Sequence, residues 1–158
     1  EQVSQSRLIE ALKAGNVFQA VPSGSLESLF EEVAVRMALP QPTGDSLSDI
    51  LLQREHLSST GISNGIAIPH SKTPLGKQIS QSMVATFFLE KPMDFNAPDG
   101  LPVFVLFVLL SVDSFHHLLL LSQLARILSQ PQMNDFLKNS PSSENLIEQF
   151  QKALAETA

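Results

Sequence analysis

The side chains of this sequence that are best suited to chemistry are its four histidines, His56, His70, His116 and His117. The ordinary pKa of an imidazole is about 6.5, so near neutral pH the ring is largely uncharged and one nitrogen can attack an electrophile such as phosphorus. His70 has the most constrained backbone, because Pro69 precedes it and two glycines lie just upstream. A nucleophile must be held in one orientation, so we expect His70 to be the reactive residue.

A nucleophile for phosphorus also needs groups that stabilise the charge of the transferred phosphoryl group. Arg54 stands at the end of a predicted helix and offers a fork of donors to phosphoryl oxygens. The same residue is equally consistent with a surface arginine that forms an ion pair with a glutamate. His116 and His117 are adjacent on a predicted helix and point about 100° apart, so at most one faces a given pocket. Helical periodicity does not choose between them.

Other catalytic chemistries have less support in the sequence. The chain has no cysteine, which excludes disulfides, thiolate metal sites and a thiol nucleophile. The histidines lack the H-x-H or H-x-x-x-H spacing of metal ligands, so a metal centre built with Asp94 or Asp99 is disfavoured and we expect no metal. A serine hydrolase is disfavoured because no G-x-S-x-G motif occurs.

Composition indicates a folded protein that does not bind nucleic acid. The 158 residues are 43% hydrophobic and 16% charged, and we expect them to form one domain over residues 1–158. Lysine and arginine are scattered and the net charge is −6, so the basic stripe of a nucleic-acid-binding surface is missing. The longest apolar run, residues 103–110, is far shorter than the roughly 20 residues that span a bilayer. The first residues lack the basic segment followed by an apolar segment that is typical of a signal peptide. We therefore expect a cytoplasmic protein without membrane insertion.

Alternating helical and strand patterns position the candidate residues. Apolar residues at helical spacing, preceded by capping residues, predict helices over residues 6–14, 26–37, 45–54, 113–128, 133–138 and 142–154. Short apolar runs predict strands over residues 17–21, 66–68, 82–89 and 102–110. The third helix therefore delivers Arg54, and the second strand leads directly into Pro69 and His70.

Several expectations concern the connections and single positions. Gly15 is expected to cap the first helix, residues 39–44 to form a proline-rich break, and residues 71–78 to form an exposed loop. Pro92 is expected in a turn-rich connection between the last two strands, and Gln123 is expected to face water.

The predicted strands over residues 82–89 and 102–110 are hydrophobic on both faces, and this pattern predicts the fold class. Such strands need cover on both sides, which is typical of sheets that are buried between layers of helices. We therefore predict an α/β fold with a mixed, mostly parallel central sheet and helices on both faces.

The sequence around His70 resembles a known family. Arg54-Glu55, residues 59–62 and the run Gly-Ile-Ala-Ile-Pro-His at residues 65–70 are similar to the phosphohistidine motif of enzyme IIA domains. These are the IIA domains of the fructose/mannitol class (type 2) in the bacterial phosphoenolpyruvate-dependent phosphotransferase system. Later blocks of that family are similar to residues 92–95, 97–100 and 102–103 and to the helix that contains His117. The resemblance covers nearly the whole chain and implies the mannitol-type IIA fold.

The resemblance implies a phosphoryl relay. His70 would accept a phosphoryl group from the phosphohistidine carrier HPr and pass it to a cysteine of a IIB component for sugar uptake, with no metal or organic cofactor. Arg54 and His117 match the family's supporting arginine and second histidine, whereas His116 is an extra residue that the motif does not require. Because this chain has no cysteine, the acceptor thiol would belong to another chain or segment.

Two departures from the family pattern leave its branches open. Ser71 stands where many members have glycine, and residues 110–113 lack the proline often found before the second-histidine helix. Residues 97–100 are similar to the nitrogen-regulatory branch, while residues 68–73 are equally similar to sugar-uptake members. The alternative function is therefore that of a nitrogen-regulatory IIA protein, which binds and regulates transporters or kinases according to its phosphorylation state. A related anion-transporter domain that has lost phosphotransfer is disfavoured, because the reactive residues are present.

Overall fold

A four-stranded mixed sheet lies at the centre of the computed structural model, which describes residues 2–39 and 46–157. Its strands are β1 (Val17–Val21), β2 (Ile66–Ala67), β3 (Met83–Met93) and β4 (Val103–Leu110), in the spatial order β1-β3-β4-β2. β1 is parallel to β3 and β2 is parallel to β4, whereas β3 and β4, the longest pairing, are antiparallel. The predicted mixed sheet with mostly parallel neighbours is confirmed.

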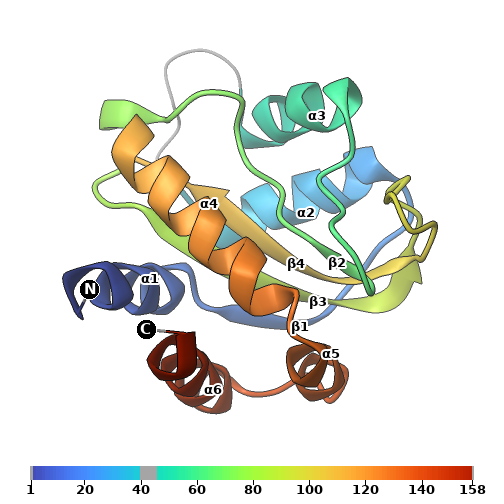
Figure 1. The fold of residues 1–158 in the computed structure, drawn as a ribbon. Coiled ribbons are helices and arrows are strands. Elements are labelled where there is room, and N and C mark those ends of the chain that lie inside the picture. The colour runs from blue at the N-terminus through green and yellow to red at the C-terminus, as the bar shows by residue number, and fades with distance from the viewer. Residues whose placement is uncertain (1, 40–45, 158) are drawn as a thin grey trace.

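Helices cover both faces of the sheet, as the hydrophobic strands predict (Figure 1). On one face lie α2 (Leu26–Met37) and α3 (Leu47–Leu57). On the other lie α1 (Gln2–Gly15), α4 (Ser114–Leu128), α5 (Pro131–Leu137) and α6 (Ser143–Thr157). A short 3-10 turn, Gly76–Gln78, lies between β2 and β3.

The side chains of β4 show how one strand serves two cores. Val105, Phe107 and Leu109 belong to the cluster packed with α1, α4, α5 and α6. Leu106 and Leu110 belong to the cluster packed with α2 and α3. Successive side chains of a strand point to opposite faces, so a strand buried on both sides must be hydrophobic throughout.

Local capping residues set where the helices begin. The side-chain oxygen of Ser25 accepts a hydrogen bond from the backbone of Ser28 at the start of α2, Ser46 does the same for Asp49 in α3, and Asp113 starts α4. Each oxygen satisfies a backbone N–H that has no partner within its helix. The predicted break at residues 39–44 falls mostly on residues 40–45, which lie outside the described residues.

The end of the first helix differs from the prediction. The helix spans Gln2–Gly15 instead of residues 6–14, and the left-handed residue after it is Asn16, with φ 66°, instead of Gly15. Gly15 serves a different purpose, since a Cβ there would lie 2.1 Å from the carbonyl oxygen of Val84 in β3. Glycine is therefore needed for the close approach of α1 to the sheet.

Three further predictions need correction. Pro92 lies inside β3 rather than in the following turn, in the stretch between Phe88 and Met93 where the register with β4 shifts. Such an irregularity tolerates a residue without an N–H. Gln123 is only partly exposed, because α4 packs against helices as well as the sheet. Ser71 is buried, so the segment that leaves His70 is not exposed throughout.

Candidate functional site

A β-hairpin carries the chain into His70. Asn64 and Gly65 form its turn with φ values of 57° and 84°, the left-handed backbone that Asn-Gly hairpin turns require. The two arms are joined where the N–H of Ile68 donates to the carbonyl of Thr60 at 3.0 Å. The second arm contains β2, which pairs with β4 and so fixes the hairpin to the central sheet.

The backbone that leads to His70 is anchored at further points. The carbonyl of Pro69 accepts a hydrogen bond of 2.9 Å from the N–H of Leu109, and His70 forms a bridge with the same residue of β4. At the hairpin tip, the carboxylate of Asp99 accepts the N–H of Asn64 at 2.8 Å. The histidine is thus carried by a segment that is held at both its base and its tip.

A buried carboxylate, Glu55 of α3, clamps the start of the hairpin. Its two oxygens accept the backbone N–H of Thr60 at 2.8 Å and the hydroxyl of Thr60 at 2.6 Å, and the Glu55 residue is 7% exposed. Burial raises the pKa of Glu55, while the bonds from Thr60 and the charges of Arg54 and His56 oppose that rise. Sequence reasoning assigns Glu55 no such role. The available signal is its place beside Arg54 and ahead of Thr60 in the family motif.

The His70 ring is buried, with 9% of the residue exposed, and its Nδ1 lies 2.7 Å from the carbonyl oxygen of Ile68. A carbonyl only accepts, so Nδ1 carries the proton and Nε2 keeps the lone pair in the neutral ring. Burial lowers the pKa of His70, the charges of Arg54 and His117 lower it further, and the Ile68 bond opposes them. The site therefore favours a neutral imidazole with a nucleophilic Nε2.

His117 is the second histidine at this site. Its ring centroid lies 5.3 Å from that of His70, at an interplanar angle of 55°. The Nδ1 atom of His117 lies 3.3 Å from the hydroxyl of Ser111, and burial lowers the pKa of His117. Both rings therefore have one engaged nitrogen and favour the uncharged form.

Arg54 approaches from α3. Its Nη1 donates to the carbonyl of Ser58 at 2.7 Å, which ties the guanidinium to the end of its own helix. Within residues 2–39 and 46–157, the one arginine paired with a glutamate is Arg36, with Glu32, so the alternative of a surface ion pair for Arg54 is wrong. Its charge instead lowers the pKa of His70.

The remaining two histidines lie outside this arrangement. His56 is exposed on α3, and His116 points to a separate cluster with Asp113 and Arg7. The structure therefore brings His70, His117 and Arg54 together from three separate segments. Of the two adjacent histidines, it places His117 beside His70.

Comparisons with known proteins show the family of this chain. The family model described as "Phosphoenolpyruvate-dependent sugar phosphotransferase system, EIIA 2" matches residues 10–153. The chain belongs to this EIIA 2 family. The match includes the hairpin, His70 and the helix that carries His117.

Relatives of this EIIA 2 member include proteins named for nitrogen regulation. A nitrogen regulatory protein of Pseudomonas aeruginosa is 38% identical over 144 residues, which is 89% of this chain and 92% of that protein. The crystal structure of nitrogen regulatory protein IIA-Ntr from Neisseria meningitidis has a TM-score of 0.77 at 30% identity, covering 90% of this chain and 98% of that one. The mannitol enzyme IIA of Escherichia coli, solved in complex with phosphorylated mannitol enzyme IIB, shares the fold with a TM-score of 0.67 at 15% identity, covering 87% and 94%.

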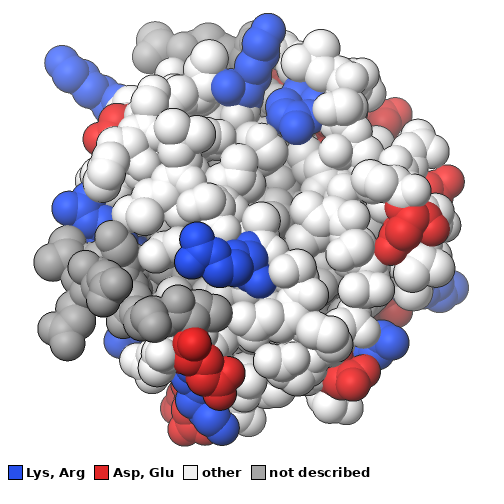
Figure 2. Space-filling model, in the orientation of Figure 1, with Lys and Arg blue, Asp and Glu red and all other residues white. Residues whose placement is uncertain are grey.

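Basic side chains are scattered over the surface of this EIIA 2 member. Figure 2 shows lysine and arginine side chains spread over one face without merging into a stripe.

Within the described ranges, no group of three or more histidine and acidic residues is placed to hold a metal ion. Asp94 and Asp99, considered above as metal ligands, instead accept backbone N–H groups of Asn96 and of Asn64 and Leu101. In the same ranges, no helix has the length and apolar character needed to cross a bilayer.

Proposed function

We propose that this chain is a phosphocarrier whose His70 accepts a phosphoryl group from HPr and passes it to a cysteine of a IIB component. The observation that carries the proposal is the orientation of the His70 ring, whose Nδ1 is held by Ile68 while the ring faces His117. Family membership supports the chemistry, and a single type-2 IIA domain over residues 1–158 is part of the proposal.

The transfer begins at Nε2 of His70. Its lone pair forms a bond to the phosphorus of phosphorylated HPr as the carrier's own nitrogen–phosphorus bond breaks and its electron pair returns to the carrier. The proton on Nδ1 of His70 stays in place, and its bond to the Ile68 carbonyl stabilises the positive charge that the phosphorylated ring acquires. In the second step a cysteine thiolate of IIB attacks phosphorus, and the electron pair returns to Nε2.

Arg54 and His117 stabilise the phosphoryl group while it is transferred. The guanidinium supplies donors for phosphoryl oxygens, and it acts in a partly buried site where its charge is less screened than in water. His117 donates a hydrogen bond from the ring nitrogen that is not turned to Ser111. Neither group forms a covalent bond, so both act by positioning and charge.

The partners reach His70 across an apolar part of the surface. Leu118, the residue after His117 in α4, is 67% exposed. Apolar side chains beside a reactive group suit a protein partner that must bring its own histidine or cysteine into contact. We propose that HPr and IIB dock here in turn.

A regulatory function of the same site is the second candidate. The observation that favours it is the similarity to the nitrogen regulatory protein of Pseudomonas aeruginosa over most of both chains. In that case the phosphorylation state of His70 would decide which transporter or kinase the domain binds. The phosphoryl group on His70 adds negative charge at the surface on which the partner docks.

One assay tests the chemistry and separates the two candidates. The protein is incubated with phosphoenolpyruvate, enzyme I and HPr, and intact mass is measured before and after acid treatment. We expect one acid-labile phosphoryl group, retained in the exposed-histidine control His56→Ala and lost in His70→Ala. Persistence of the group in His70→Ala contradicts the proposal. Transfer from the phosphorylated chain to purified IIB favours the sugar-uptake relay, and an adduct that no fructose- or mannitol-class IIB accepts favours regulation.

A further inference from the structure

Both ring nitrogens of His116 are bound to charged side chains. Nδ1 lies 2.7 Å from Oδ1 of Asp113, and Nε2 is hydrogen-bonded to Nη1 of Arg7. Arginine only donates, so Nε2 must accept and Nδ1 must carry the proton that is donated to Asp113. His116 is therefore a neutral bridge between a cation on α1 and the capping carboxylate of α4.

The bridge reaches the backbone of the reactive site through Asp113. The same Oδ1 atom that binds the His116 ring also accepts the backbone N–H of His116 at 2.8 Å. The carbonyl of Asp113 accepts the backbone N–H of His117 at 3.0 Å. Because Asp113 holds the first turn of α4, its orientation sets the position from which the His117 side chain extends.

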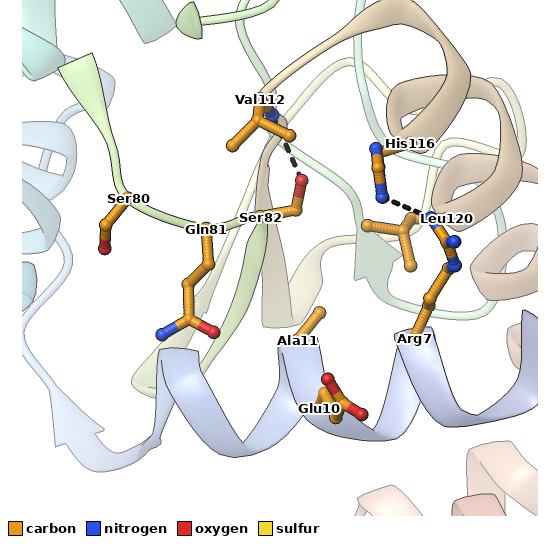
Figure 3. A pocket seen from close by; sticks show the side chains of 9 residues that line it. All are labelled: Arg7, Glu10, Ala11, Ser80, Gln81, Ser82, Val112, His116 and Leu120. Atoms are coloured by element: carbon orange, nitrogen blue, oxygen red, sulfur yellow. Dashed lines mark hydrogen bonds between the residues drawn. The ribbon is translucent and has the colours of Figure 1, made fainter. Parts of the chain in front are cut away.

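The Arg7 end of the bridge is held in a surface pocket of about 260 Å³ between α1, α4 and the start of β3. Figure 3 shows Arg7 extending from α1 to His116, with Leu120 behind the pair. The guanidinium carbon lies 5.3 Å from the ring centroid of Phe115, so Arg7 also makes a cation–π contact with α4. Arg7 and His116 are partly exposed and line this pocket, so their substitution leaves no buried cavity.

We infer that His116 is a positioning residue, which ties the first turn of α4 to α1 through Arg7 and Asp113 and so holds the His117 ring against His70. This inference rests on the proposed function for its kinetic consequence alone, since the placement of the His117 ring is a structural quantity. It gives a purpose to the extra histidine that the family motif does not require.

The test measures phosphoryl transfer from phosphorylated HPr to the full chain. We expect His116→Ala to lower the maximal rate by about tenfold with little change in KM, because misplacement of a catalytic group by about an ångström costs up to ~10²-fold. Arg7→Met should act in the same direction, and Arg7→Lys should restore part of the rate by keeping a cationic donor. Arg126→Met, which removes an exposed arginine of α4, is the matched control.

A second background separates positioning of His117 from a general loss of structure. In a chain that already carries His117→Ala, His116→Ala should have no further effect on the rate, because the ring that it positions is absent. The same fold loss in both backgrounds overturns the inference, and so does an unchanged rate in the wild-type background.

A readout independent of phosphoryl transfer distinguishes failure of the inference from failure of the proposed function. Histidine ring signals in NMR spectra should shift for His117 in both His116→Ala and Arg7→Met, and remain unchanged in Arg126→Met. Unchanged His117 signals in the first two variants overturn the inference. Shifted signals in a chain that accepts no phosphoryl group support the positioning role and contradict the proposed function instead.

Discussion

The adjacent histidines of α4 lie in two contrasting environments. His116 has both ring nitrogens bound, one to the cation of Arg7 and one to the carboxylate of Asp113. His117 has one nitrogen near the hydroxyl of Ser111, and its ring faces His70, which in turn has one nitrogen bound to a carbonyl. No partner for the other nitrogen of His70 or His117 occurs in the part of the chain that the structure describes.

The difference shows what separates a histidine held through both ring nitrogens from one that keeps a nitrogen available. A neutral imidazole has one donor and one acceptor nitrogen, so a ring with both nitrogens bound has no lone pair left for a substrate. A ring held through one nitrogen is oriented and still has the other available. An arginine lies near the ring in both environments. Arg7 contacts His116 directly, whereas Arg54 is hydrogen-bonded to Ser58 and affects the pKa of His70 through its charge.

The largest expected effect on the rate of phosphoryl transfer comes from replacing Arg54. Arg54→Gln should lower the rate of phosphoryl transfer to His70 by about 10²–10³-fold, the usual loss when one stabilising donor is removed from a reacting centre. The same change should raise the pKa of His70, because the charge of Arg54 lowers it. Transfer kinetics and NMR titration of the histidine rings measure the two quantities.

Arg7→Gln is the matched substitution at the arginine that binds His116. It should reduce the rate by only about tenfold, because Arg7 acts through the position of His117 and not on the phosphoryl group. Equal losses of transfer rate in Arg54→Gln and Arg7→Gln would contradict the proposed difference between the two arginines.

The next effect concerns how the hairpin of His70 is held. Glu55→Leu leaves the N–H and hydroxyl of Thr60 without their acceptor, so it should lower the free energy of unfolding by about 1–3 kcal/mol. Glu55→Gln should cost less, because its amide can accept from the N–H and donate to the hydroxyl of Thr60. Urea denaturation compares the two variants. Equal stability of Glu55→Leu and Glu55→Gln would argue against the clamp.

Local patterns in the sequence account for most of the fold. Strand β4 is apolar throughout and β3 is mostly apolar as far as Leu89, and capping residues such as Ser25, Ser46 and Asp113 stand where the helices begin. These features act over a few residues and can be recognised without the fold. The structure differs from the sequence predictions where contacts with a distant element determine a residue's environment. Gly15 is needed because α1 approaches the backbone of β3, and Gln123 is partly covered by packing around α4.

The candidate site likewise has some features that local sequence predicts and others that depend on packing. The constrained backbone of His70 can be recognised from its neighbours, but the 5.3 Å approach of His117 depends on how α4 packs over the sheet. Helical periodicity gives the angle between His116 and His117 and not which of them faces inward. The clamp from Glu55 to Thr60 is a side-chain contact with a loop, for which sequence has no periodic pattern.

The smallest effect is expected in the pH dependence of stability. Burial lowers the pKa of His70 and of His117 in the folded chain, whereas the unfolded chain takes up protons near the ordinary value of 6.5. As the pH falls below that value, the unfolded state binds more protons than the folded state, so the free energy of unfolding decreases. Glu55 contributes with the opposite sign, because its raised pKa makes stability fall as the pH rises.

Replacing both rings isolates the histidine contribution from that of Glu55. In the double variant His70→Gln/His117→Gln, the loss of stability between about pH 7 and pH 5.5 should be smaller than in the wild type, because neither new side chain titrates. Urea unfolding at a series of pH values gives the two slopes. A slope as steep in the double variant as in the wild type would mean that these rings stay as easily protonated after folding as before. The contrast between these two rings and the doubly bound ring of His116 would then rest on hydrogen bonding alone, and burial would play no part in keeping His70 and His117 uncharged.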